Sequence, residues 1–240
     1  MSLTQLDWDS DFFRLKIGKI DLQGLDLNGL DQEICNARNR GYSLLYLFGS
    51  LDNRLHPDWQ NENGCNLVDT KVTYEKFGLR PKITLPGILS HETDKIEQLY
   101  ELAYESGKYS RFKLDHRFGS ESFKSLYRAW VDNSVSRMIA DHILVYKEGH
   151  SVCGFCTVRR SNDKATIGLI AVSPQHQGRG IGRNLCEAVE AWSVQHGCQK
   201  ITVATQMANE GACRFYEKMG MAIVESMDIY HLWLNTNDPL

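Results

Sequence analysis

The sequence predicts an α/β fold with a smaller N-terminal domain over residues 1–82 and a larger C-terminal domain over residues 83–240. Two observations carry this prediction. Segments with apolar residues at helical spacing alternate with short apolar or alternating runs typical of strands. Two glycines and two prolines gather within residues 78–87, as expected of a domain boundary. With 240 residues, the chain is long enough to bury a large core without disulfides or metals.

The N-terminal part predicts one helix and two strands. Residues 28–40 carry Leu30, Ile34 and Ala37 at helical spacing, and Gly41 follows as a stop. The apolar run at 42–48 predicts a buried strand, and the alternation at 68–76 predicts a half-buried one. The polar stretch at 52–64, with one proline and one glycine, predicts a loop.

The C-terminal part predicts two helices first and then strands. A helix should begin after residue 90, capped by Ser90 or Thr93, and a second should span 120–135. Residues 110–117 between them form a basic and aromatic connection. The remaining segments predict strands at 142–146, 151–159, 165–172, 200–205, 221–224 and 227–234, and helices at about 181–192 and 209–219.

Composition excludes several classes of function. Lys and Arg number 27 against 30 Asp and Glu, for a net charge of −3, which offers no electrostatic footprint for nucleic acid or an anionic membrane. We find neither a signal peptide nor an apolar stretch near the roughly 18 residues of a membrane span. Seven cysteines at irregular spacing favour a cytoplasmic protein with reduced thiols.

The most informative segment is the glycine-rich Gln177-Gly178-Arg179-Gly180-Ile181-Gly182, which separates a strand pattern from a helix pattern. Free N–H groups at a helix start bind anions, and glycines let phosphate oxygens approach the backbone. Arg183 stands where a dinucleotide fingerprint needs glycine, and no Gly-Lys-Ser/Thr follows as in a Walker loop. The segment therefore predicts a pyrophosphate-bearing ligand, the alternative being a glycine-rich helix start without one.

This segment, with Pro174 before it, resembles motif A of the GNAT acetyltransferase superfamily. Asn209, Ala212, Tyr216 and Gly220 resemble a second block of that superfamily. The resemblance implies the GNAT fold, a central mixed and mostly antiparallel sheet flanked by helices. It also implies acetyl-CoA as the co-substrate and no metal.

The resemblance further implies site residues. Backbone groups of Ile170, Ala171 and Val172 would bind the pantetheine arm and the thioester oxygen. Gln177 and the amides of Gly178, Arg179, Gly180, Ile181, Gly182 and Arg183 would hold the pyrophosphate, and Asn209 would bind near the thiol. Tyr216 would be the general acid that protonates the leaving thiolate, the alternative being that it only packs against its helix neighbours.

Further segments resemble the TDP-fucosamine acetyltransferases within the superfamily, namely Trp8 to Phe13, Ser110 to Phe112, Tyr127 to Ser134 and Ala204 to Met207. This resemblance implies a TDP-linked amino-dideoxy sugar as acceptor, with Arg111, Lys113 and Gln206 binding it. Arg111, Lys113 and Arg117 have the charge to bind a diphosphate, the alternative being a solvated basic connection.

Several alternatives stay open. The acceptor amine could belong to a peptide N-terminus, a polyamine or an antibiotic, or the domain could bind acyl-CoA only to regulate a partner. The sequence does not identify the general base, for which His116, His142, Asp115 and Gln206 are candidates. Cys153 and Cys156 form a C-x-x-C without a second pair, which disfavours a metal site. The oligomeric state, a homodimer included, is left open.

Overall fold

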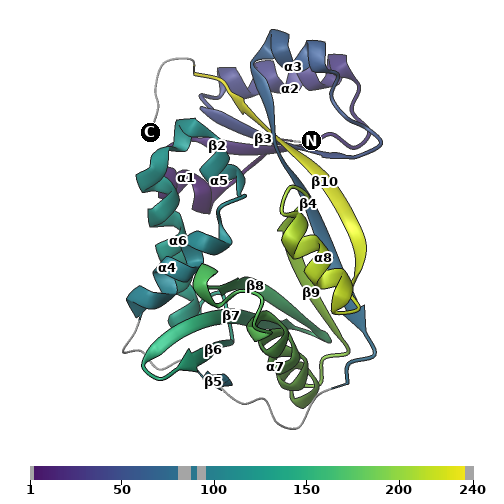
Figure 1. The fold of residues 1–240 in the computed structure, drawn as a ribbon. Coiled ribbons are helices and arrows are strands. Elements are labelled where there is room, and N and C mark those ends of the chain that lie inside the picture. Colours follow the sequence, from purple (N-terminus) through teal and green to yellow (C-terminus); the bar gives the residue numbers. More distant parts are fainter. Residues whose placement is uncertain (1–2, 81–87, 91–95, 236–240) are drawn as a thin grey trace.

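The computed structural model describes residues 3–80, 88–90 and 96–235. Within these residues ten strands form one sheet in the order β1-β2-β3-β10-β4-β9-β8-β7-β6-β5 (Figure 1). Neighbouring strands pair antiparallel except β2 with β3 and β8 with β9, which are parallel. The predicted mixed, mostly antiparallel sheet with flanking helices is therefore confirmed.

The strands are β1 (Leu3–Gln5), β2 (Ile17–Asp21), β3 (Leu44–Ser50), β4 (Cys65–Phe77), β5 (Ile88–Ser90), β6 (His142–Glu148), β7 (Ser151–Ser161), β8 (Lys164–Val172), β9 (Lys200–Gln206) and β10 (Ala222–Trp233). The helices are α1 (Asp7–Phe13), α2 (Leu27–Asn39), α3 (Pro57–Asn63), α4 (Ile96–Ser106), α5 (Arg111–Leu114), α6 (Gly119–Val135), α7 (Ile181–Gln195) and α8 (Glu210–Lys218). Short 3₁₀ turns lie at His116–Phe118 and Pro174–His176. None of the described helices is long and apolar enough to cross a membrane.

The structure corrects the prediction of a loop at 52–64, because α3 forms there. His56 caps this helix by accepting from the N–H of Asp58, Pro57 occupies the first turn, and Gly64 ends it with φ of 63°. Those are ordinary helix start and stop signals. The prediction of a loop gave more weight to the polar composition of this stretch than to these signals. In the structure, the helix buries the side chain of Trp59.

Three further differences concern short elements and one bulged strand. The sequence reading missed β1, α1 and β2, which are short and weakly patterned. The two strand pieces predicted at 221–224 and 227–234 are one strand, β10, whose register with β4 shifts between Ile223 and Glu225. Such a bulge offsets the alternation by one residue, which makes one strand look like two. The basic connection at 110–117 contains the short helix α5.

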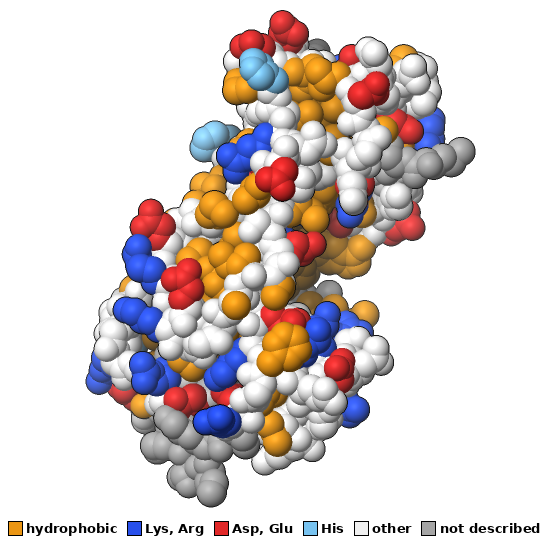
Figure 2. Space-filling model, turned by 90° about the vertical axis from the view of Figure 1, so that its right-hand side faces the viewer, with side chains coloured by type: hydrophobic (Ala, Val, Ile, Leu, Met, Phe, Trp, Pro, Cys, Tyr) orange, Lys and Arg blue, Asp and Glu red, His pale blue; other side chains and the backbone are white. Residues whose placement is uncertain are grey.

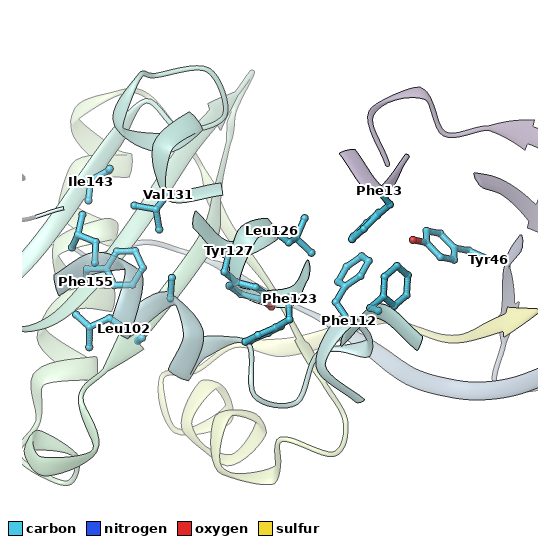
Figure 3. Close-up of a cluster of buried hydrophobic side chains, with 14 of the residues drawn as sticks. Phe13, Tyr46, Leu102, Phe112, Phe123, Leu126, Tyr127, Val131, Ile143 and Phe155 are labelled. Atoms are coloured by element: carbon cyan, nitrogen blue, oxygen red, sulfur yellow. The ribbon is translucent and has the colours of Figure 1, made fainter. Parts of the chain in front are cut away.

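The sheet is continuous across the predicted domain boundary. Strand β4, from the N-terminal part, lies between β10 and β9 of the C-terminal part. One hydrophobic cluster likewise joins Phe13 and Tyr46 to Phe112, Leu102 and Phe155 (Figure 3). The division at residues 82 and 83 stays a prediction, and most of the predicted linker, like the proposed cap Thr93, lies outside the described residues.

The helices cover the two faces of the sheet differently. Along β7, Phe155 packs into the cluster that contains α4 and α6, whereas its neighbour Cys156 packs into the cluster that contains α7 and α8. Because successive strand residues point to opposite faces, α4 to α6 lie on one face and α7 and α8 on the other (Figure 1).

Candidate active site

The parallel strands β8 and β9 separate in the middle of the sheet. They pair only between residues 164–167 and 200–203, although β8 continues to Val172 and β9 to Gln206. On its other side β8 remains paired with β7 as far as Val172. The edge of β8 that faces the opening therefore presents backbone N–H and C=O groups without a strand partner, which an extended ligand can pair with.

A cavity of about 840 Å³ runs through this opening and is lined from both faces of the sheet. Its size suits a ligand that is largely enclosed by the protein. On one side it is lined by the glycine-rich turn, Asn209 and Tyr216, and on the other by Asp69, Lys71, Arg111, Tyr127 and Trp130. The opening thus joins two chemically different halves, which we call the glycine side and the basic side.

The glycine side is built by the turn before α7. Gly178 and Gly180 have φ of 76° and 83°, the left-handed conformation that glycine adopts without strain. Gln177 donates from Nε2 to the carbonyl of Val172 at 3.1 Å, which ties the turn to the end of β8. A Cβ at Gly178 or Gly180 would meet nothing within 4 Å. The turn therefore leaves open space over the N–H groups at the start of α7, as an anion site requires.

The structure brings most of the predicted coenzyme residues to this cavity. Those that line it are Ile170, Ala171, Val172, Gln177, Gly178, Gly180, Ile181, Gly182, Arg183 and Asn209. Arg179 does not line it, and its Nη1 lies 3.4 Å from Oε2 of Glu148. Asn209 caps α8 by accepting from the N–H of Ala212 at 3.2 Å, which leaves its amide NH₂ available to a ligand.

Tyr216 combines packing with access to the cavity. Its side chain is buried, with ring centroids of Tyr74 and Phe215 at 5.5 Å and 5.3 Å, and it also lines the cavity. Burial, with nearby Cys186 and Cys156, raises the pKa of the Tyr216 phenol well above its usual value. The phenol therefore keeps its proton at neutral pH, as a proton donor must.

Arg111 dominates the basic side. Its guanidinium carbon lies 4.6 Å from the ring centroid of Tyr46 and 4.5 Å from that of Phe112. Its Nε is buried without a hydrogen-bond partner in the part of the chain that the structure describes. Two aromatic rings thus fix this cation, and its Nε is left for a ligand. Gln206 also lines the cavity, opposite Lys71 in the β4–β9 ladder.

Two other cations of the connection lie elsewhere. Lys113 is exposed and outside the cavity lining, with its Nζ 5.2 Å from the ring centroid of Phe123. Arg117 donates to the carbonyl of Asn235 at 2.7 Å and stacks over Trp233. Arg111 is therefore the residue of this basic segment that is placed for a ligand in the cavity.

Over the face at the right of Figure 1, charges of both signs are interspersed (Figure 2).

The structure separates the candidate bases. Asp115 accepts from Nδ1 of His231 at 2.6 Å and from Trp233 at 2.9 Å, so its carboxylate is already engaged. His142 lies beside Trp192 at a different surface pocket, and His116 is exposed outside the cavity. Gln206 is in the cavity but carries no basic group at neutral pH.

The sequence did not lead us to predict one residue of the cavity, Asp69. Asp69 lies on β4 within the half-buried segment and lines the basic side. Burial raises its pKa to about 7, an effect reduced by the charges of Arg111 and Lys71 and supported by Asp228. The sequence does place Asp69 and Lys71 on the same face of a half-buried strand, which could have indicated a site. Only the order of strands in the sheet brings these two residues to the cavity.

Within the described residues, the two cysteines of the C-x-x-C pair do not belong to one group of possible metal ligands. Cys153, without Cys156, groups with Glu148 and His176 among the described residues, their ligand atoms lying within 4.8 Å of one another. Arg179 already balances the charge of Glu148 there. Burial raises the pKa of the Cys156 thiol well above its usual value, which disfavours the thiolate that a metal needs.

Comparison with known proteins agrees with this geometry. A sequence profile described as Acetyltransferase (GNAT) family matches residues 96–221, more than half of the chain. The spore coat polysaccharide biosynthesis protein SpsD of Bacillus subtilis is 28% identical over 142 residues, which cover 59% of this chain and 49% of that protein. A dTDP-fucosamine acetyltransferase of Escherichia coli is 32% identical over 142 residues, covering 58% and 59%. The chain thus matches about half the length of these relatives.

Solved structures show the same fold at low identity. A GCN5-related N-acetyltransferase from Sphaerobacter thermophilus superposes with a TM-score of 0.58 at 14% identity, covering 93% of this chain and 75% of that one. A functionally unknown conserved protein from Staphylococcus epidermidis superposes with a TM-score of 0.67 at 13% identity, covering 91% and 84%. At such identities the likeness concerns the arrangement of strands and helices, including the N-terminal elements.

Proposed function

The chain belongs to the GNAT family of acetyltransferases, and on this premise we propose that it transfers acetyl from acetyl-CoA to the primary amine of a nucleotide-linked amino-dideoxy sugar. One observation carries the proposal. A cavity through the sheet joins a glycine-rich anion site to a pocket in which Nε of Arg111 has no hydrogen-bond partner among the described residues. Two substrates that enter from opposite faces would meet at the opening between β8 and β9.

The glycine side supports acetyl-CoA as the donor. The turn at Gln177–Arg183 has open space over its N–H groups, where the pyrophosphate would bind. The edge of β8 between Gly168 and Val172 would pair with the amide groups of the pantetheine arm. One of its N–H groups would then stabilise the oxygen that becomes negative when the thioester is attacked.

We propose direct transfer with Tyr216 as the general acid. The amine attacks the thioester carbon, and the C–S bond of the intermediate breaks to release the coenzyme thiolate. Tyr216 lines the cavity and retains its proton, so its hydroxyl would protonate the sulfur. No acyl-enzyme is required.

The basic side supports an anionic acceptor. Arg111 and Lys71 line it, and neither forms an ion pair within the described residues, whereas Lys108 is paired with Glu105 at 2.6 Å. A guanidinium matches a diphosphate in both charge and shape. The relative named dTDP-fucosamine acetyltransferase points in the same direction. We therefore propose a TDP-linked amino sugar, with Arg111 at its diphosphate, rather than a polyamine.

Incubation of the purified protein with acetyl-CoA and TDP-4-amino-4,6-dideoxygalactose tests the proposal. We expect release of free thiol together with a sugar product heavier by one acetyl group. A panel of peptide N-termini, polyamines and aminoglycosides serves as the comparison. Activity confined to that panel would refute the sugar acceptor. Tight acetyl-CoA binding with no turnover of any amine would favour the regulatory alternative.

The proposal also places the protein in the cytoplasm. All seven cysteines are free thiols, and a reducing compartment keeps such thiols unpaired. Fractionation of cells that express the protein from its own promoter checks this, and recovery in an extracytoplasmic fraction would contradict it.

A further inference from the structure

We infer that Asp69 is the general base that takes a proton from the acceptor amine. The inference rests on the proposed acetyl transfer but not on the identity of the sugar. It assigns a catalytic role to a strand that lies before the segment matched by the family profile, residues 96–221.

The position of Asp69 in the sheet supports this role. It lies on β4 directly opposite Ile229 of β10, two residues before Lys71, and lines the cavity with Arg111. Tyr74, on the other face of the same strand, packs against Tyr216. Asp69 and Tyr216 therefore approach the same cavity from opposite faces of the sheet. An amine held near Asp69 would meet a thioester lying in the opening, with Tyr216 behind it.

The carboxylate of Asp69 also has no other structural task. Within the described part of the chain it forms no hydrogen bond and no ion pair. Other shielded acids here are engaged, since Asp115 binds His231 and Trp233, and Asp228 binds Thr70 and Arg54. A partly buried carboxylate without a partner costs stability unless a ligand supplies one. An acceptor ammonium would be such a partner.

The surroundings tune this carboxylate for proton transfer near neutral pH. Arg111 from α5 and Lys71 from β4 favour its ionised form, while burial and Asp228 from β10 oppose it, and the pKa settles at about 7. The charge of Asp69 in turn helps to raise the pKa of Tyr127 from α6. A base whose pKa lies near the working pH is ionised often enough to act and basic enough to hold the proton.

The protons balance without a further reactant. Asp69 accepts one proton from the bound ammonium, which yields a neutral amine, and later returns that proton to water. The amine nitrogen forms the new C–N bond, and the C–S bond breaks with its electron pair on sulfur. Tyr216 gives its proton to this sulfur and is reprotonated by the second proton that nitrogen loses as the amide forms.

The test compares Asp69→Asn with the wild type across pH. For the wild type, kcat/KM should rise with pH and level off above about pH 7. For Asp69→Asn we expect a loss of about 10²- to 10⁴-fold near pH 7. Its remaining activity should keep rising at higher pH, as the free amine becomes available from water. The affinity for acetyl-CoA, measured by calorimetry, should stay near wild type, whereas the affinity for the sugar should fall because its ammonium loses a carboxylate partner.

Two further variants make the test decisive. Glu75→Gln removes a carboxylate from the same face of β4, but Glu75 pairs with Lys200 outside the cavity lining, so turnover should stay near the wild-type value. Asp69→Glu retains a carboxylate and should retain a levelling pH profile, with its midpoint displaced. This variant also tests the role should the asparagine variant fail to fold.

Three results separate failure of the base from failure of the proposed function. Wild-type rate and pH profile in Asp69→Asn would overturn the role of Asp69 while leaving the acetyltransferase intact. Activity of the wild type on a different amine would refute the sugar, and Asp69 is then tested with that amine. A wild type that binds acetyl-CoA but acetylates no amine would refute both.

Discussion

Replacing Asp69 by asparagine should make the folded protein more stable than the wild type at pH 8, by an amount that grows as pH rises from about 4 to about 7. The pKa of Asp69 is raised from an ordinary value of 3.8 to about 7 by folding. Between those values the folded wild type binds more protons than the unfolded chain, so its free energy of unfolding falls as pH increases. Asparagine does not titrate, so the variant escapes this loss.

The size of the effect follows from the pKa difference. A shift of about three units, at about 1.36 kcal/mol each, sets an upper limit of about 4 kcal/mol. Asp69 is only partly buried and borders a cavity that water can enter, and hydration there weakens the penalty. We therefore expect a gain of about 1–2 kcal/mol at pH 8 relative to about pH 4.

Urea unfolding followed by tryptophan fluorescence measures this difference at several pH values. The midpoint should change while the slope with urea stays constant, since the two proteins expose the same surface on unfolding. Glu75→Gln is the matched control. It should lose stability, because it breaks the Glu75–Lys200 pair at 3.1 Å. A difference between Asp69→Asn and wild type that does not vary with pH would refute the raised pKa and remove one support for the general base.

The other predictions concern the acid, the cation and the core. Tyr216→Phe should lower kcat by about 10²-fold or more while the affinity for acetyl-CoA stays near wild type, because only the proton is lost; unchanged turnover in stopped thiol-release assays would exclude the role. Arg111→Lys should raise KM for the nucleotide sugar by about 10-fold or more and leave KM for acetyl-CoA unchanged, since an ammonium cannot replace the guanidinium fork; an equal rise in both constants would place Arg111 elsewhere in the mechanism. Phe112→Ala should destabilise the protein by about 3–5 kcal/mol in urea unfolding, because Phe112 is buried among Phe13, Phe118 and Trp130; a loss below about 1 kcal/mol would show that this part of the cluster is loosely packed.

Local patterns in the sequence were sufficient for the parts of the fold that local physics controls. Helix α2 follows from apolar spacing and from Gly41 as a stop, and the structure adds a cap by Asp26, whose Oδ1 accepts from the N–H of Gly29 at 2.8 Å. The glycine turn follows equally, because Gly178 and Gly180 need the left-handed conformation that side chains oppose. Where local cues conflicted, as at α3 between polar composition and sound capping residues, composition misled the prediction.

The residues of the glycine side could also be predicted from the sequence, because they lie close together in the chain. Strand β8, the turn and α7 are consecutive, so the residues that would hold the coenzyme come from one stretch of sequence. Asn209 and Tyr216 follow as the cap and a residue of one helix, α8. That Lys113 shares the acceptor site with Arg111 stays a prediction, and α5 directs the two cations to different surroundings.

The sequence by itself therefore determined most of the longer helices and strands, the glycine turn and the resemblance that singles out Tyr216. Only the tertiary structure decided what faces them, because that depends on pairings between distant residues. Asp69 reaches the cavity because β4 lies between β10 and β9. Its pKa is raised by burial, which outweighs the lowering by Arg111, 42 positions later in the chain. Spacing along a strand fixes the face on which a side chain lies, but not the neighbours that set its chemistry.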